Sequence, residues 1–197
     1  ETKTVDINAL GHDEIFHHSQ EPTCTERGWH AYGSCLRSHY STYNELPANG
    51  HNWLNGLCTV CGELVPSDGL YYSLYVGDVY GVKIGNCTDA NIVIPSSYDG
   101  KPVRYIDGES FRYNQTIKSI TIPNSVTKIL SPFAFSDCSG LTSINVYENN
   151  PYFQSIDGNL YSKDGKTLIQ YAVGKKDTFF TIPSSVTSIG EGAFYGC

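Results

Sequence analysis

Hydrophobic and polar residues alternate along the second half of the chain, in short segments that recur. The segments are Ile92-Val-Ile-Pro95, Ile120-Thr-Ile-Pro123 and Phe180-Thr-Ile-Pro183, and each precedes a turn and a short apolar stretch. Ile144 and Val146 continue the alternation one interval after Ile120 and Ile122. Alternation places every second side chain on one face of a half-buried strand. Because one such face cannot be buried alone, the pattern predicts stacked units that form a solenoid.

Two other segments of this half predict hairpins. The stretch 152–178 contains two Asp-Gly turns between short apolar runs, which indicates a β-hairpin inserted into the solenoid. The stretch 67–91 contains Gly77-Asp78 between two runs rich in Tyr and Val, which indicates another hairpin. We assign the latter as an N-terminal cap, since the first unit of a solenoid needs its open apolar edge covered. The sequence therefore predicts a mainly β domain over residues 67–197.

Longer stretches of this domain resemble a known repeat family. The segments Ser119–Ile129, Ala134–Ile144 and Ile182–Cys197 closely resemble the BspA-type leucine-rich repeats of bacterial surface proteins, and the resemblance covers roughly residues 90 to 197. It implies a leucine-rich-repeat solenoid with inserted β-hairpins. It also implies a secreted or cell-surface bacterial protein, outside the cell, that takes part in adhesion or host interaction.

Residues 1–66 differ in style and predict a separate small module. They contain four Cys and all six His, and their apolar periodicity is poor. A core this thin generally needs a metal or disulfides. Cys35-Leu-Arg-Ser38 and Cys58-Thr-Val-Cys61 resemble the paired elements of short Cys-rich repeats found beside such solenoids, in which the first element also reads Cys-x-x-Cys. With a Cys at position 38, the spacing would be close to that of a four-thiolate zinc ribbon.

A structural zinc site is therefore one interpretation of this Cys/His-rich, zinc-ribbon-like module. Its ligands would be Cys35, Cys58 and Cys61, with His39 as the fourth, or with Cys24 or His51 in that place if the chain folds back. The alternative is that Ser38 abolishes metal binding, and that Cys24 with Cys35, or Cys58 with Cys61, forms a disulfide or stays reduced. A closed four-ligand site has no open position for water, so zinc here would support folding and not catalysis.

The three remaining cysteines belong to the repeats. Cys138 and Cys197 each end a Phe-x-x-Cys step, and a recurring Cys at such a position is a small, inward-facing residue. We expect buried free thiols there, and an internal position for Cys87 as well. Reactive cysteines need an exposed, electropositive setting, so these thiols are not candidates for chemistry.

The charge and the motifs of the sequence argue against nucleic-acid binding, a membrane span and catalysis. The net charge is −7 and the 13 basic residues are scattered, so no basic stripe would neutralise nucleic-acid phosphates. No apolar run is long enough for a membrane span. Because the sequence starts without Met or a signal segment, we expect a portion of a longer processed protein. Nucleophile-elbow, phosphate-loop and zinc-protease motifs are absent, and all six histidines precede residue 52, so we expect no catalytic residues.

Two functional classes remain. In the first, the solenoid binds a host or matrix protein or a glycan, with aromatic contacts from some of its tyrosines. The tyrosines considered are Tyr71, Tyr72, Tyr75, Tyr105, Tyr113, Tyr147 and Tyr152. In the second, the chain is a spacer or stalk that carries another domain and has no ligand of its own. A contiguous exposed aromatic patch would favour binding, and an evenly polar surface would favour the spacer. The sequence assigns neither the ligand nor the oligomeric state.

Overall fold

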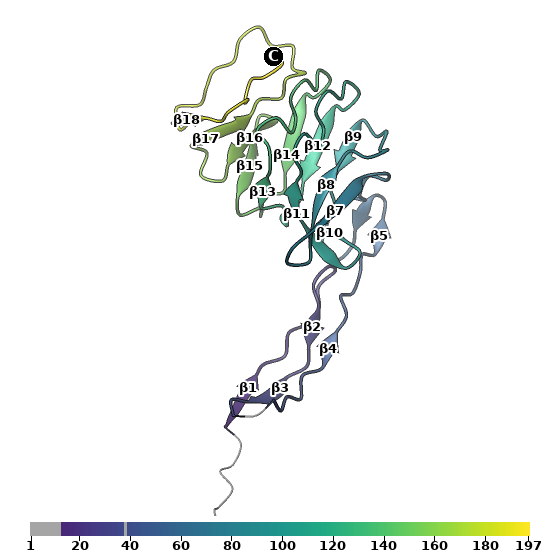
Figure 1. Ribbon diagram of the computed structural model, residues 1–197. Helices are drawn as coiled ribbons and strands as arrows, with labels where there is room; N and C mark the ends of the chain where they lie inside the picture. The colour runs from purple at the N-terminus through teal and green to yellow at the C-terminus, as the bar shows by residue number, and fades with distance from the viewer. Residues whose placement is uncertain (1–12, 38) are drawn as a thin grey trace, which may run out of the picture. The chain divides into compact units, whose positions relative to one another are not determined.

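The computed structural model describes residues 13–37 and 39–197 (Figure 1). These residues form short strands joined by turns, with no helix among them, and hence no helix that could cross a membrane. The chain divides into two compact units, Glu1–His51 and Asn52–Cys197. The boundary expected from sequence, between residues 66 and 67, stays a prediction. Ser38 lies outside the described residues.

The first unit consists of two short antiparallel pairs. Strand β1 (Glu14–His17) pairs with β3 (Tyr32–Cys35), and β2 (Gly28–Trp29) pairs with β4 (Glu45–Leu46). In the β1–β3 hairpin the His17 ring stacks on Tyr32, with ring centroids 4.2 Å apart.

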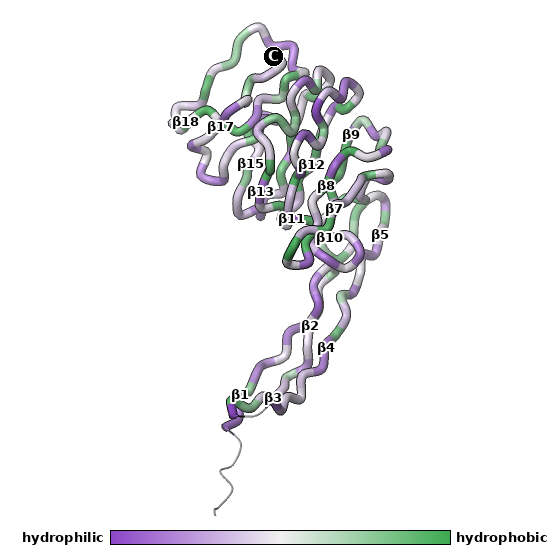
Figure 2. The backbone as a smooth tube through the Cα atoms, in the orientation of Figure 1, coloured by the Kyte–Doolittle hydropathy of each residue, from purple (hydrophilic) through white to green (hydrophobic). Residues whose placement is uncertain are grey.

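This unit has almost no hydrophobic core. Within residues 13–37 and 39–51, Cys24, Gly28 and Cys35 alone are classed as buried, while Phe16 is 66% exposed. Figure 2 shows polar residues along much of this part of the chain. Burial of apolar surface is the main favourable term in folding, so other interactions must stabilise this segment.

The second unit starts with a two-residue hairpin. Strands β5 (Trp53–Leu54) and β6 (Leu57–Cys58) flank Asn55-Gly56, whose φ values of 52° and 82° suit a type I′ turn. The following residues bond to the repeats. Leu64 N donates to Tyr147 Oη at 2.8 Å, and Ser67 N donates to Val93 O at 3.0 Å.

Next comes the predicted hairpin around Gly77-Asp78. Strands β7 (Tyr71–Tyr75) and β8 (Val79–Lys83) pair antiparallel, and β8 pairs parallel with β11 (Lys101–Ile106). The same sheet contains β10 (Ser97–Tyr98), antiparallel to β11, and β13 (Lys128–Ile129), parallel to it.

The repeated Ile segments stack in a parallel column. It contains β9 (Asn91–Val93), β12 (Ser119–Ile122) and β14 (Ser143–Val146). Ile120 lies beside Ile92 on one side and Ile144 on the other, so the register reproduces the repeat interval of the sequence. Their side chains are fully buried. The predicted fold class, a mainly β leucine-rich-repeat solenoid with inserted hairpins, is confirmed.

The aromatic turns fill the interior of the solenoid. Phe111 and Phe135 are buried and stack with an interplanar angle of 4° and centroids 5.9 Å apart. Cys138 is fully buried, and its Sγ lies 2.9 Å from Phe111 O. Full burial of each aliphatic or aromatic side chain of this size contributes roughly 1.5–3 kcal/mol, so the stacked units stabilise one another.

The insertion after β14 is a three-stranded antiparallel sheet. It contains β15 (Phe153–Ile156), β16 (Asn159–Ser162) and β17 (Thr167–Gln170), and β18 (Ser188–Ile189) then pairs parallel with β17. The Asp157-Gly158 turn joins β15 to β16, with φ values of 49° and 71°. The register returns to parallel stacking at β18, so the insertion interrupts the solenoid without ending it.

Asn150 fixes the start of this insertion. Its side chain is fully buried, and Nδ2 donates to Pro123 O at 2.8 Å and to Val126 O at 3.0 Å. Its Oδ1 accepts from Tyr152 N at 2.8 Å and from Phe153 N at 2.9 Å. One amide side chain therefore connects the preceding repeat to the first strand of the inserted sheet.

Candidate functional site

A set of tyrosines lies on one face of the β7–β8–β11 sheet. Residues that are directly opposite in neighbouring strands share a face, and the buried Val82 and Ile106 mark the face that covers the core. Tyr71, Tyr75 and Tyr105 lie on the other face, because their pairing partners are Lys83, Val79 and Gly81. Tyr71 is 59% exposed. This face points to solvent and carries aromatic rings.

A buried carboxyl group lies beneath these rings. Asp107 is 1% exposed, its Oδ1 accepts from the Tyr75 hydroxyl at 2.8 Å, and its Oδ2 lies 3.9 Å from Lys83 Nζ. The hydrogen bond to Asp107 raises the pKa of Tyr75. A Cβ at Gly81 would lie 2.0 Å from Asp107 Oδ1, so glycine leaves the room that this side chain occupies. The arrangement holds Tyr75 in a fixed orientation.

A second group of tyrosines lies at the edge of the core face of the same sheet. Tyr72 and Tyr98 stack with centroids 3.9 Å apart, and Tyr80 meets the Tyr98 ring edge-on at 5.2 Å. Burial raises the pKa of Tyr72 to about 12. Tyr98 is 46% exposed, and Val76, at the tip of the hairpin, is completely exposed.

We call the exposed side chains of this sheet the tyrosine surface. Its members are Tyr71, Leu74, Tyr75, Val76 and Tyr98. Of the other tyrosines considered from sequence, Tyr72 and Tyr105 lie in the same sheet, and the remaining three lie elsewhere. Tyr147 accepts the bond from Leu64, Tyr113 packs against Arg112 with the guanidinium carbon 4.6 Å from the ring centroid, and Tyr152 is in the turn before β15.

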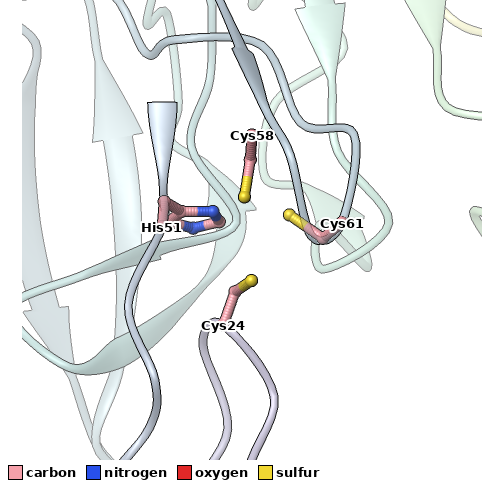
Figure 3. Close-up of side chains that lie close together, drawn as sticks. All are labelled: Cys24, His51, Cys58 and Cys61. Atoms are coloured by element: carbon pink, nitrogen blue, oxygen red, sulfur yellow. The ribbon is translucent and has the colours of Figure 1, made fainter. Parts of the chain in front are cut away.

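The structure also brings four potential metal ligands together (Figure 3). They are Cys24, His51, Cys58 and Cys61, and their ligand atoms all lie within 4.8 Å of one another. Cys24 and Cys58 are buried, His51 is half-buried and Cys61 is exposed. Figure 3 shows the three sulfur atoms and the imidazole ring directed toward a common point.

Local backbone bonds position each of these side chains. Gly50 N donates to Cys24 O at 3.0 Å, which holds Cys24 beside the residue preceding His51. Cys58 ends the short β5–β6 hairpin, which starts at Trp53, close to His51 in the chain. Gly62 N then donates to Cys58 O at 2.9 Å and closes the tight turn that contains Cys61.

Part of the ligand set expected from sequence lies in this cluster. Cys58 and Cys61 are in it, and so are both residues considered as alternative fourth ligands, Cys24 and His51. Cys35 and His39 are not members. Cys35 ends strand β3, where it pairs with Glu14 in the other hairpin, and His39 is an exposed residue that follows it. The sequence argument gives Cys24 only as an alternative, because a backbone contact and not a Cys-x-x-Cys turn brings it to the cluster.

The cysteines of the repeats are separate from this cluster. Cys138 and Cys87 are buried, as expected, and burial raises the pKa of the Cys138 thiol to about 11. Cys197, the last residue of the sequence, is exposed, in contrast to the buried position expected for it. Cys138 is enclosed because Phe111 from the preceding turn contacts its sulfur and Leu141 N bonds to its carbonyl oxygen.

A shallow cavity lies beside the inserted sheet. Its volume is about 560 Å³, and Asp157, Asn159, Lys175, Asp177 and Phe180 are among the residues that line it. No histidine or cysteine lines it. It therefore offers charged, hydroxyl and aromatic contacts.

The repeats identify the family of this protein. Residues 85–168 and 171–197 match the BspA type leucine rich repeat region, in six copies. More than half of the chain is matched, so the protein belongs to the BspA-type leucine-rich-repeat family.

Several solved structures of bacterial leucine-rich-repeat proteins are similar to this chain. A leucine-rich repeat protein from Eubacterium ventriosum is 30% identical, with 54% of this chain and 27% of that chain covered and a TM-score of 0.48. The pneumococcal vaccine antigen PcpA is 27% identical, with 49% and 24% covered and a TM-score of 0.42. A leucine rich cell surface protein from Faecalibacterium prausnitzii is 22% identical, with 68% and 34% covered and a TM-score of 0.44. This chain thus spans about a quarter to a third of their length. No curated protein matches the chain.

Proposed function

We propose that this chain is a non-enzymatic part of a bacterial surface or secreted protein, and that it binds a host or matrix protein or a glycan through the tyrosine surface. The observation that carries the proposal is the exposure of several aromatic and aliphatic side chains on the β7–β8 hairpin, with Tyr71 on the outer face of β7, Leu74 on its other face and Val76 at the tip. Tyr71, Leu74 and Val76 are 59%, 56% and 101% exposed. Exposed apolar groups gathered in this way are typical of interaction sites, whereas single ones are common on any surface.

The chemistry of these side chains suits recognition. Tyrosine presents a large, rigid ring with few rotatable bonds, so it loses little conformational entropy on binding. Tyr75 and Tyr105 pack edge to face at 5.2 Å, and the hydrogen bond to Asp107 further restrains Tyr75. Preorganised rings of this kind can stack on the apolar face of a sugar or pack against a protein side chain. Family membership supports the same proposal by analogy.

A spacer is the second candidate. The observation that favours it is the first unit, whose described part has few buried residues and strands of only two to four residues. A segment with few buried residues and short strands is suited to connecting other domains and less suited to binding a ligand. In that case the solenoid would present another domain, and the tyrosine surface would have no ligand.

The two candidates differ in a direct binding experiment. The chain is passed over immobilised mucin glycoprotein and collagen and over a glycan array, and it is compared with the double variant Tyr71→Ser/Val76→Ser. We expect at least tenfold weaker binding by this variant, equivalent to about 1.4 kcal/mol. Tyr152→Ser is the matched control, because Tyr152 is 52% exposed and lies outside the tyrosine surface. Equal binding by the double variant and the control would refute the role of this surface, and no binding to any probe would favour the spacer.

A further inference from the structure

We propose that Cys24, His51, Cys58 and Cys61 bind one Zn²⁺ ion that replaces a hydrophobic core in the N-terminal part of the chain. This proposal is independent of the ligand-binding function. It rests on three observations: the composition and spacing of the cluster, the scarcity of buried residues around it, and a second copy of the same hairpin that lacks the full ligand set.

The four side chains fit zinc in type and in distance. Three thiolates and one imidazole are among the usual ligand sets of structural zinc, and soft sulfur ligands disfavour magnesium and calcium. Ligands about 2.0–2.3 Å from a tetrahedral ion lie about 3.5–3.8 Å from one another. The four ligand atoms lie within 4.8 Å, so movements of about an ångström bring them to these positions. Because all four corners are filled by protein, no open position is left for a reacting water.

The surrounding chain needs such an ion. In residues 13–37 and 39–51 the buried residues are Cys24, Gly28 and Cys35, and from Asn52 to Pro66 the buried residue is Cys58. Cys24 and Cys58 are themselves members of the cluster. Small modules without an apolar core depend on metal or disulfides for folding, and metal binding then supplies the folding free energy.

The β5–β6 hairpin that carries Cys58 repeats the β1–β3 hairpin. Trp53 pairs with Cys58 in one, as Glu14 pairs with Cys35 in the other. The backbone bonds around each pair also recur. Thr59 N donates to Asn52 O at 2.9 Å, and Leu36 N donates to Asp13 O at 3.1 Å. Two further hydrogen bonds recur. Cys35 N donates to Tyr40 O as Cys58 N donates to Glu63 O, and Thr42 N donates to Gly33 O as Val65 N donates to Gly56 O.

The two copies differ in their ligands. The offset in sequence that relates Cys35 to Cys58 also relates Ser38 to Cys61, so the first copy has a hydroxyl in the sequence position of a thiol. A serine hydroxyl is not among the ligands of structural zinc. Among the described residues, Cys35 belongs to no group of three or more potential metal ligands. The four ligands therefore converge at the Cys58–Cys61 turn of the second copy, and we assign one ion per chain.

The fourth ligand comes from within the first copy. Cys24 lies in the segment that joins β1 to β3, and the Gly50–Cys24 bond holds it next to the segment that carries His51. In this proposal a Cys from one repeat thus completes the ligand set of the other, in place of Cys35 from a paired Cys-x-x-Cys element.

The test is the metal content of the full chain, purified without a tag under reducing conditions and measured by elemental analysis. We expect about one zinc per chain for the wild type, and less than about 0.2 for Cys58→Ser and for Cys24→Ser. The matched control is Cys35→Ser, which removes the equivalent thiol of the first copy and should keep the zinc. Circular dichroism of the repeat strands checks that each variant is folded.

A second measurement covers variants that fold poorly. Reconstitution of the wild type with Co²⁺ should give the visible absorption of a tetrahedral thiolate site, and Cys24→His should keep the metal but shift this spectrum. Wild-type protein without metal after reconstitution, a disulfide within the cluster in place of metal, or equal zinc loss in Cys35→Ser would each overturn the proposal. Two zinc ions per chain would overturn the assignment of a single site.

Discussion

Asn150 is the residue whose loss should reveal most about how the inserted sheet is attached. Replacing it with alanine removes the four hydrogen bonds to Pro123 O, Val126 O, Tyr152 N and Phe153 N. The site is fully buried, so water cannot easily replace the lost partners. At a net value of about 1 kcal/mol for each bond, Asn150→Ala should cost about 4 kcal/mol in the free energy of unfolding.

The assay is urea unfolding followed by far-ultraviolet circular dichroism, with Asn149→Ala as the matched control. Asn149 is the exposed neighbour, and its replacement should change the free energy of unfolding by no more than about 0.5 kcal/mol. A thermal scan should show Asn150→Ala melting roughly 10 °C lower, at about 2–4 °C for each kcal/mol. If Asn150→Ala loses less than about 1 kcal/mol, the four bonds do not stabilise the junction and our reasoning about it is refuted.

Two further predictions concern the interior of the repeats. A Cβ at Gly140 would lie 2.5 Å from Gln115 O and 2.7 Å from Ile117 O, so Gly140→Ala should destabilise the protein by about 2 kcal/mol in urea unfolding. Gly108→Ala, whose Cβ would meet its nearest atom at 3.6 Å, should be tolerated, and similar losses for both variants would contradict the steric argument. Because burial raises the pKa of Cys138 to about 11, its thiol stays protonated at pH 8, and iodoacetamide should alkylate exposed Cys197 far faster than Cys138. Peptide mass spectrometry across pH 7–9 measures the two rates, and equal rates in the folded protein would be inconsistent with the buried position.

The repeat spacing is sufficient to predict the solenoid. Ile92, Ile120 and Ile144 are enough for this prediction. Alternating apolar residues specify each strand, and the recurring interval specifies its parallel neighbour. The junction at Asn150 is not predictable in this way. An asparagine before a proline is typical of an ordinary turn, and two of the four bonds of Asn150 depend on carbonyl groups that are remote in sequence, those of Pro123 and Val126.

The Cys/His cluster is only partly accessible from sequence. The Cys-x-x-Cys at 58–61 is a local signal, and it correctly predicts one half of a cluster. The other half depends on a backbone contact between residues 24 and 50 that no spacing rule encodes. A signal is nevertheless present: Gly33-Ser-Cys35 and Gly56-Leu-Cys58 are copies of one element, and aligning them separates Cys35 from the second site.

The orientation of the tyrosines follows from strand alternation, but their exposure does not. Tyr71 and Tyr72 are neighbours in sequence and lie on opposite faces of β7. Which face meets the core is decided by β11, since it places Val103 and Ile106 against the repeats. The sequence of the β7–β8 hairpin alone therefore does not determine which of its faces is buried, because the partner strand β11 does.

The parallel column of β9, β12 and β14 has a mechanical consequence. Its hydrogen bonds join successive turns of the solenoid. A force that pulls the two ends of the column apart therefore breaks the bonds of one turn before those of the next. Each released turn, such as the one from β12 to β14, would add about 80 Å of extended chain at roughly 3.3–3.6 Å for each residue. A protein of this build would lengthen in discrete steps under tension, and the bonds of Asn150 would set the resistance of the step at the inserted sheet.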